Sequence, residues 1–110
     1  MLEAIHAALV AAFKTPDSDR TQRLTEHDAD HFEIPPDRTP AYTLIEITAF
    51  PGRSLDAKRA LYRGIAARLE AIGIAPADVL IVLSEPAPES WSLRGGVAAC
   101  DVGIGYKIEV

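Results

Sequence analysis

The stretch "AYTLIEITAFPGRSLDAKRALYRGIAARLEAIGI", residues 41–74, predicts a strand, a turn and a helix in that order. Residues 41–50 are β-branched or aromatic on both faces, which is typical of a strand covered on both sides. The turn "PGRS" ends on Ser54, a residue suited to cap the following helix, and Gly73 suits a Schellman ending. A second apolar run, "DVLIVLSE" at 78–85, predicts another covered strand. One side of the helix carries an aliphatic stripe at helical spacing: Leu61, Ile65, Leu69 and Ile72.

The chain opens directly on a helical pattern, "MLEAIHAALVAAF". We expect this helix to end near Lys14, because Pro16 disfavours helical geometry in the residue before it. The segment "RTQRLTEH", residues 20–27, alternates weakly and carries threonines, which predicts a strand. Residues 28–40 are expected to form a loop. The apolar positions of the helix share one face: Leu2, Ile5, Leu9, Val10 and Phe13.

An internal repeat relates the two parts of the chain. With an offset of 59, residues 2–26 align without gaps on residues 61–85, and seven positions are identical: Leu2, Ala7, Ala8, Ala12, Asp19, Leu24 and Glu26. Both copies run through helix, Pro-containing turn, Asp and strand, and they end in "LTE" and "LSE". The pattern predicts a duplicated β-α-β unit in which the counterpart of the leading strand, residues 41–50, would lie ahead of Met1.

The predicted fold class is therefore α+β, with a mixed sheet, two helices on one of its faces, and the first strand of the first unit absent. We expect a single domain over residues 1–110. Its halves are residues 1–40 and 41–96, and residues 97–110 form a tail with a short strand. The closing "YKIEV" alternates apolar and charged residues, so we propose that residues 104–110 fill the absent strand's position, in this subunit or a neighbour.

Composition excludes several function classes. A formal net charge of −5 opposes a phosphate-binding surface, so no nucleic-acid partner is expected. No aliphatic run approaches the ~18 residues of a membrane span, and no basic cluster marks a signal peptide. Cys100 is the only cysteine, which rules out an intrachain disulfide and favours a reducing compartment. We expect a cytoplasmic protein that does not bind a membrane.

Three segments together resemble the tautomerase superfamily: "DSDRTQRLTEH", "YTLIEITAFPGRSLDAKRALY" and "APADVLIVLSEPAPESWSLRGG". The likeness spans Leu2 to about Gly96 and is greatest to the longer members, such as malonate semialdehyde decarboxylase. It implies a four-stranded sheet with two helices on one face, usually in a homotrimer, and an isomerase activity. The family's base is an amino-terminal proline at the start of the first strand, whose amine moves a proton between carbon atoms. This chain has no counterpart of that proline.

The resemblance also implies candidate site residues. Arg53 matches an arginine that holds a substrate carboxylate, and a solvated turn arginine is the alternative. Asp19 matches an aspartate that helps polarise substrate or activate water, and a turn ligand like its repeat partner Asp78 is the alternative. A second family arginine is replaced here by Pro51, which weakens any expectation of decarboxylation.

Two further candidates lie in the segment that resembles the border of the family's pocket. Trp91 is a contact for substrate or a core residue, and Arg94, before two glycines, is placed to reach an anion. The segment "HDADH" (His27, Asp28, Asp30 and His31) contains metal-ligand residue types, but its spacing matches no known closed site. We expect a solvated loop there, with no metal and no cofactor.

Three functions stay open at this stage. The first is a keto–enol tautomerase acting on a small carboxylated keto or enol acid, if the base is supplied, with Arg53 and Asp19 as catalytic-site residues. The second is a non-catalytic trimeric scaffold or small-anion-binding relative. The third is an unrelated small α+β dimeric ligand-binding module.

Overall fold

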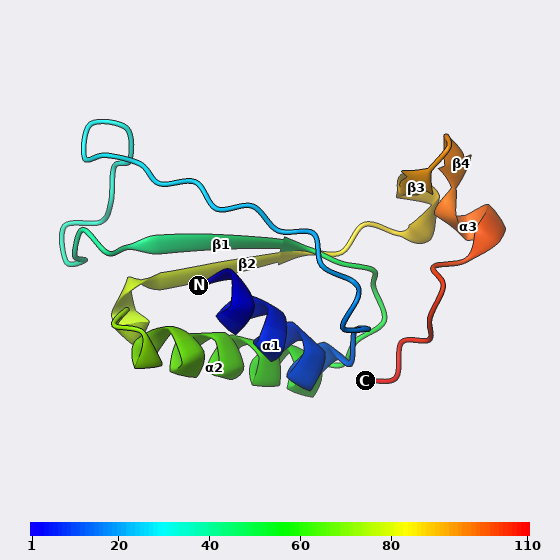
Figure 1. The fold of residues 1–110 in the computed structure, drawn as a ribbon, viewed down its shortest axis with the longest axis horizontal. Helices are drawn as coiled ribbons and strands as arrows, with labels where there is room; N and C mark the ends of the chain where they lie inside the picture. The colour runs from blue at the N-terminus through cyan, green and yellow to red at the C-terminus, as the bar shows by residue number, and fades with distance from the viewer.

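A computed structural model describes all residues, 1–110, and shows an α+β fold, as the sequence predicts (Figure 1). Two helices and two strands form the body. These are α1 (Leu2–Phe13), β1 (Thr43–Thr48), α2 (Leu55–Ala71) and β2 (Val79–Ser84). Short elements follow: β3 (Ser92–Arg94), β4 (Val97–Ala98) and α3 (Ala99–Val102). One 3₁₀ turn, Pro76–Asp78, precedes β2, and another, Pro88–Ser90, precedes β3.

Strands β1 and β2 pair in parallel, in register from Thr43 opposite Val79 to Thr48 opposite Ser84. Both helices lie on the same face of this sheet (Figure 1). The core between the layers is apolar and joins both halves of the repeat: Ile5, Ala8, Phe13, Ile45, Ala57, Leu61, Ile65 and Leu69. The opposite face of the sheet carries no helix and leaves Leu80 43% and Val82 49% exposed.

Local signals fix the ends of both helices where the sequence predicts them. The Ser54 hydroxyl accepts a hydrogen bond from the Ala57 N–H at 3.1 Å, which caps α2. At the other end Gly73, with φ of 98°, and Ile74 donate to carbonyls of the last turn, which is the expected Schellman motif. Helix α1 ends at Lys14, whose φ of 57° turns the chain out of the helix.

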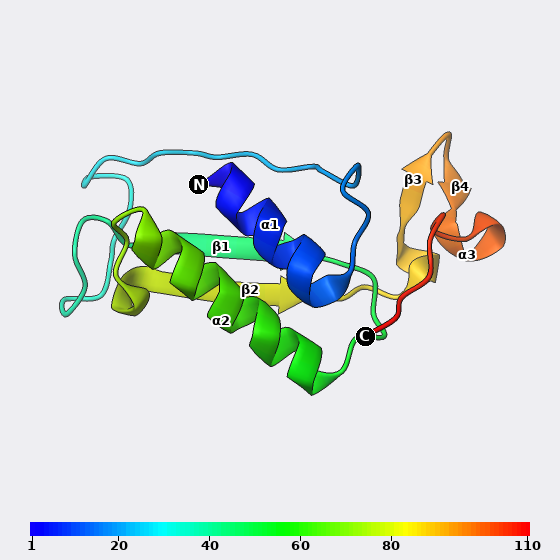
Figure 2. The same ribbon diagram turned by 60° about the horizontal axis from the view of Figure 1, so that its bottom comes forward.

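The strand predicted at residues 20–27 does not form. The segment runs beside α1 and along the sheet, but it has no ladder partner (Figure 2). Its sequence is suited to a strand, yet a strand needs a paired neighbour about 4.8 Å away, and the only strand that pairs with β1 is β2. The sheet of the body therefore has two strands rather than a larger mixed set.

The C-terminal residues form a small lobe beyond the end of β2 (Figures 1 and 2). Its strand pair is β3–β4, antiparallel, so the short strand of the 97–110 tail lies at its beginning. Residues 104–110 form no strand and do not occupy the position beside β1 in this chain. Instead Val110 packs against the core and Ile108 lies against Gly52. None of the helices has the length and hydrophobicity needed to cross a membrane.

Candidate functional site

A long groove of about 1680 Å³ follows the free edge of β1. One wall is the apolar side of α1, the other is the extended segment of residues 21–29, and β1 forms the floor between them. At the carboxyl end of β1 the groove ends against residues from four parts of the chain: Thr15, Asp19, Phe50, Arg53, Trp91 and Tyr106. The repeat and the turn after β1 thus bring three of the four predicted site residues to one place.

Arg53 is the buried cation of this site. It is only 6% exposed, so the alternative of a solvated turn arginine is wrong. Its guanidinium donates to the Phe50 carbonyl at 3.1 Å and lies 4.6 Å from the centre of the Phe13 ring. A longer contact of 3.5 Å reaches the Phe13 carbonyl. No carboxylate pairs with it, and its Nε has no hydrogen-bond partner.

Aromatic side chains form the apolar side of the site. Trp91 stacks on Phe50 with ring centroids 4.3 Å apart, and its indole N–H donates to the Pro86 carbonyl at 2.9 Å. Trp91 is half-buried: its indole packs against Phe50, and the residue also lines the groove. The low dielectric of such a wall strengthens any charge interaction at Arg53.

Asp19 and Arg94 share a second, smaller cavity of about 370 Å³ that opens next to the first. Asp19 lines both cavities, and its carboxylate makes no hydrogen bond within its turn. The Asp19 side chain therefore does not act as a hydrogen-bond acceptor that stabilises its turn. Arg94 is exposed at the end of β3 and has no ion-pair partner, so both charged groups are available to a bound molecule.

Asp78, the repeat partner of Asp19, has the structural role that its sequence position suggests. The N–H of Thr39 donates to its carboxylate at 2.9 Å, and the Thr39 hydroxyl makes a second, short hydrogen bond. These two bonds lower the pKa of the Asp78 carboxyl below its ordinary value. The contact ties the residues before β1 to those before β2.

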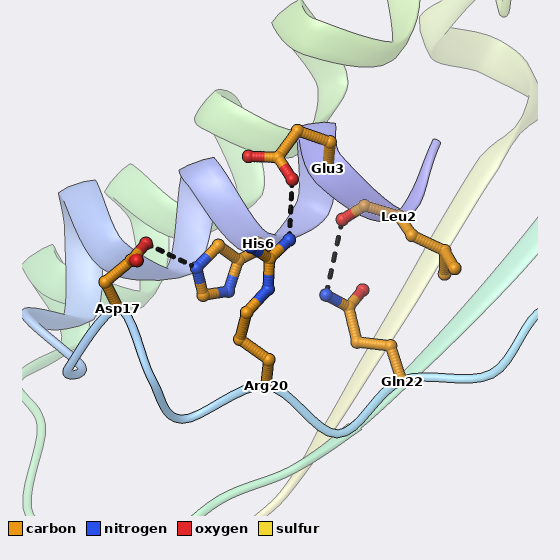
Figure 3. Close-up of polar contacts among 6 residues, drawn as sticks. All are labelled: Leu2, Glu3, His6, Asp17, Arg20 and Gln22. Carbon is orange, nitrogen blue, oxygen red and sulfur yellow. Dashed lines mark hydrogen bonds and ion pairs between the residues drawn. The ribbon is translucent and has the colours of Figure 1, made fainter.

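Polar contacts tie residues 17–22 to α1 (Figure 3): His6 with Asp17, Glu3 with Arg20, and the Leu2 carbonyl with Gln22. The buried His6 donates from Nε2 to the Asp17 carboxylate at 3.0 Å. This hydrogen bond lowers the pKa of Asp17. The outer wall of the groove is thus held by helix contacts rather than by a strand ladder.

Sequence reasoning missed several groups at the site. Tyr106 of the tail lines both cavities, and the buried Thr15 hydroxyl has no hydrogen-bond partner. Neither position carries a local pattern, since only the folded chain brings the tail and the turn to the groove. In the "HDADH" segment His31 contacts Asp28 at 2.5 Å, and His27 packs edge-on against Phe32. No group of three potential ligands could hold a metal ion.

The amino end of the chain lies far from Arg53. Arg53 contacts the carbonyl of Phe13, the last residue of α1, whereas Met1 precedes its first residue. Twelve helical residues span about 18 Å at 1.5 Å per residue, so the Met1 nitrogen is at the other end of the groove. It cannot act as a base on a molecule held by Arg53.

Comparisons with known proteins agree on one family. A family model described as a tautomerase enzyme matches residues 19–94. Probable tautomerase YusQ of Bacillus subtilis is 30% identical over 100 residues, which are 86% of this chain and 79% of that protein. Among solved structures, malonate semialdehyde decarboxylase superposes with a TM-score of 0.82 at 31% identity, covering 93% of this chain and 83% of that one. A fused 4-OT symmetric trimer shares the fold, with a TM-score of 0.80 at 24% identity and coverage of 94% and 85%.

Proposed function

The chain belongs to the tautomerase family, and from that premise we propose that its site at the carboxyl end of β1 binds a small carboxylated keto or enol acid. In this proposal Arg53 holds the substrate carboxylate. The reaction is a keto–enol tautomerisation, in which a proton leaves the enol oxygen and a proton is added to the neighbouring carbon. It needs an amine base supplied beside Arg53.

One observation carries the proposal: Arg53 is buried without a counter-ion. A buried cation is costly unless it is paired, and this one has two carbonyl contacts and an unpartnered Nε. A planar guanidinium suits two-pronged binding of a carboxylate. A bound substrate would supply the missing negative charge.

The surroundings of Arg53 support defined roles for the other candidates. Phe50 and Trp91 exclude water from one side, which would strengthen the ion pair and lower the pKa of a nearby amine. In this proposal Asp19, which lines the groove and whose carboxylate makes no hydrogen bond, polarises the substrate from the rim. Arg94 would bind a second anionic group in the smaller cavity.

A second candidate function is anion binding without catalysis. It is favoured by Pro51, which stands where the resemblance implies a second arginine in the decarboxylase-like members. Both functions use Arg53 to bind a carboxylate, and they differ only in whether a base lies beside it.

We further propose a cytoplasmic homotrimer. The uncovered face of the sheet exposes Leu44, Leu80 and Val82, an apolar surface suited to burial between subunits. The structural neighbours include a symmetric trimer of fused 4-OT. The lone exposed Cys100 fits a reducing compartment.

A binding and a turnover measurement test these proposals. Phenylpyruvate should change the fluorescence of Trp91, the only tryptophan, and Arg53→Ala should weaken binding about 100-fold through loss of charge-assisted bonds. Arg59→Ala is the matched control, since Arg59 is an exposed arginine paired with Asp56. Unchanged phenylpyruvate affinity in Arg53→Ala would show that Arg53 does not hold the carboxylate. Ketonisation of phenylenolpyruvate then separates the candidates: a rate above buffer that Arg53→Ala abolishes supports the enzyme, and no rate supports anion binding.

A further inference from the structure

We propose that the ion pair between Lys58 and Glu85 positions Trp91 against Phe50 and so maintains the apolar side of the site at Arg53. Lys58 and Glu85 are positioning residues in this proposal, since neither lines the groove or the smaller cavity. The inference rests on the proposed function only for the ligand that the site binds. The contacts that carry it lie within the chain itself.

The Lys58–Glu85 pair differs from the other ion pairs of the chain because both of its side chains are mostly buried. Lys58 Nζ lies 2.6 Å from Glu85 Oε1, and the two side chains are 26% and 20% exposed. Each of the other pairs has at least one largely exposed side chain. The second carboxylate oxygen, Glu85 Oε2, is buried and has no hydrogen-bond partner. Lys58 is therefore the group that balances the charge of Glu85, and water and salt screen this pair less than a surface pair.

Glu85 begins the segment that carries Trp91. Strand β2 ends at Ser84, whose carbonyl accepts a hydrogen bond from the Ala49 N–H at 2.9 Å, and Glu85 is the next residue. The carbonyl of Pro86, the residue after Glu85, accepts the hydrogen bond of the Trp91 indole N–H at 2.9 Å. The place of the Glu85 carboxylate and the place of the indole's acceptor are therefore linked through one peptide unit.

The Trp91 ring in turn contacts the residue that holds Arg53. The rings of Trp91 and Phe50 are stacked, with centroids 4.3 Å apart and planes at 30°. The Phe50 carbonyl accepts a hydrogen bond from the Arg53 guanidinium at 3.1 Å. Phe50 thus joins the indole through its ring to the guanidinium through its main chain.

Helix α2 closes these contacts into a ring. Lys58 lies in the first turn of α2, where its N–H donates to the Ser54 carbonyl at 3.1 Å, and Ser54 directly follows Arg53. Each contact of the ring restrains the next one, and the ion pair is the contact that joins α2 to the segment after β2. The ring consists of Phe50, Arg53, Ser54, Lys58, Glu85, Pro86 and Trp91.

Removal of the Lys58 charge should therefore disturb the site. The Glu85 carboxylate would then be mostly buried without a partner, which is costly. Movement of Glu85 into water relieves this cost and carries the Pro86 carbonyl away from the indole. Trp91 then loses its hydrogen bond and part of its stacking, so that water reaches Arg53. An ion pair between Arg53 and a carboxylate is weaker at the higher local dielectric.

Replacing Lys58 by methionine tests the positioning role without a ligand. Methionine keeps much of the apolar stem of lysine and removes the charge. Near-UV circular dichroism reports the fixed packing of Trp91 on Phe50, and in Lys58→Met this band should lose at least about half of its intensity while the far-UV spectrum is unchanged. Lys58→Arg keeps the cation and should keep the band. Arg59→Met is the matched control and should also keep it, since Arg59 is the next residue of α2 and its pair with Asp56 is exposed.

Calorimetric titration with phenylpyruvate connects the ion pair to the site. Lys58→Met should bind phenylpyruvate about tenfold more weakly than the wild type, because the displaced indole no longer excludes water from Arg53. Lys58→Arg and Arg59→Met should bind within about twofold of the wild type. A purely structural role of Lys58 would lower the Tm of Lys58→Met and leave the affinity of the folded protein unchanged.

An unchanged near-UV band in folded Lys58→Met would overturn the positioning role, and a weakened band with unchanged phenylpyruvate affinity would overturn its connection to the site. If Lys58→Met does not fold, Glu85→Gln, which keeps the shape of the side chain and removes its charge, is measured in the same way and should change both quantities in the same directions. The proposed function fails separately: if Arg53→Ala keeps the affinity, Arg53 is not the carboxylate anchor, while the near-UV band still decides the role of Lys58.

Discussion

Replacing Arg53 by methionine should separate a ligand-binding arginine from one that holds the fold together. Methionine keeps much of the side chain's length and apolar stem but removes the buried cation. The wild-type guanidinium is balanced by one carbonyl bond of 3.1 Å, one of 3.5 Å and the Phe13 ring, with no carboxylate. The free-energy change on substitution follows from these few contacts.

The contributions nearly cancel in the ligand-free protein. Hydrogen bonds to a charged group contribute about 1.5–3 kcal/mol and a desolvated cation–π contact up to ~2 kcal/mol, whereas burial of the cation costs several kcal/mol. We expect Arg53→Met to change the free energy of unfolding by less than about 1.5 kcal/mol, or about 6 °C in Tm. Breaking a buried ion pair would cost about 3–5 kcal/mol.

Adding phenylpyruvate should show that Arg53→Met has lost ligand binding. Phenylpyruvate at a hundred times its Kd should stabilise the wild type by about 2.7 kcal/mol, near 10 °C in Tm. At the same concentration a variant with 100-fold weaker binding gains only about 0.4 kcal/mol. Thermal unfolding of both proteins, with and without ligand, measures all four values. A loss of 3 kcal/mol without ligand would make Arg53 a structural residue, and an undiminished ligand shift would place the carboxylate elsewhere.

Three further predictions concern the scaffold. Leu61→Ala should lower the free energy of unfolding by about 2–5 kcal/mol in urea denaturation, because Leu61 is fully buried, whereas Leu55→Ala, 58% exposed, should cost less than ~1 kcal/mol. Thr39→Val should lower the free energy of unfolding at pH 7, and this loss should become smaller below pH 3.8. The reason is that the Thr39 hydrogen bonds lower the pKa of Asp78 in the folded state, so they stabilise the protein above the unfolded pKa and stop doing so as the carboxylate is protonated. Urea unfolding as a function of pH checks this, and equal losses at all pH values would contradict it. Leu80→Lys on the open sheet face should abolish trimer assembly in sedimentation without unfolding the chain, whereas Leu55→Lys should leave it intact.

The parts of the fold that the sequence predicts best are those decided by neighbours in the sequence. Ser54 caps α2, Gly73 ends it, and the spacing of Leu61, Ile65 and Leu69 defines its buried face. The unpaired state of residues 20–27 could not be predicted in this way, because strand formation depends on what lies beside the segment.

The structure brings the predicted candidate residues close together, but the surroundings of each residue could not be predicted from the sequence. The resemblance identifies Arg53, Asp19, Trp91 and Arg94, and the structure places the first three at one end of the groove and Arg94 in the adjoining cavity. Burial of Arg53 depends on contacts with α1, forty residues earlier in the chain, so no local pattern reveals it. Tyr106 reaches the site only through the path of the tail.

The two halves of the repeat contribute different parts of the proposed chemistry. The carboxylate anchor, Arg53, follows the leading strand of the second half and is held by Phe50 and Phe13. The first half contributes Phe13, whose carbonyl and ring contact the guanidinium, and Asp19 at the rim of the groove. In this proposal binding depends on Arg53, whereas turnover also needs an amine base beside it. Loss of Arg53 should therefore abolish binding and turnover together, whereas loss of the base alone should leave the affinity for a keto acid unchanged.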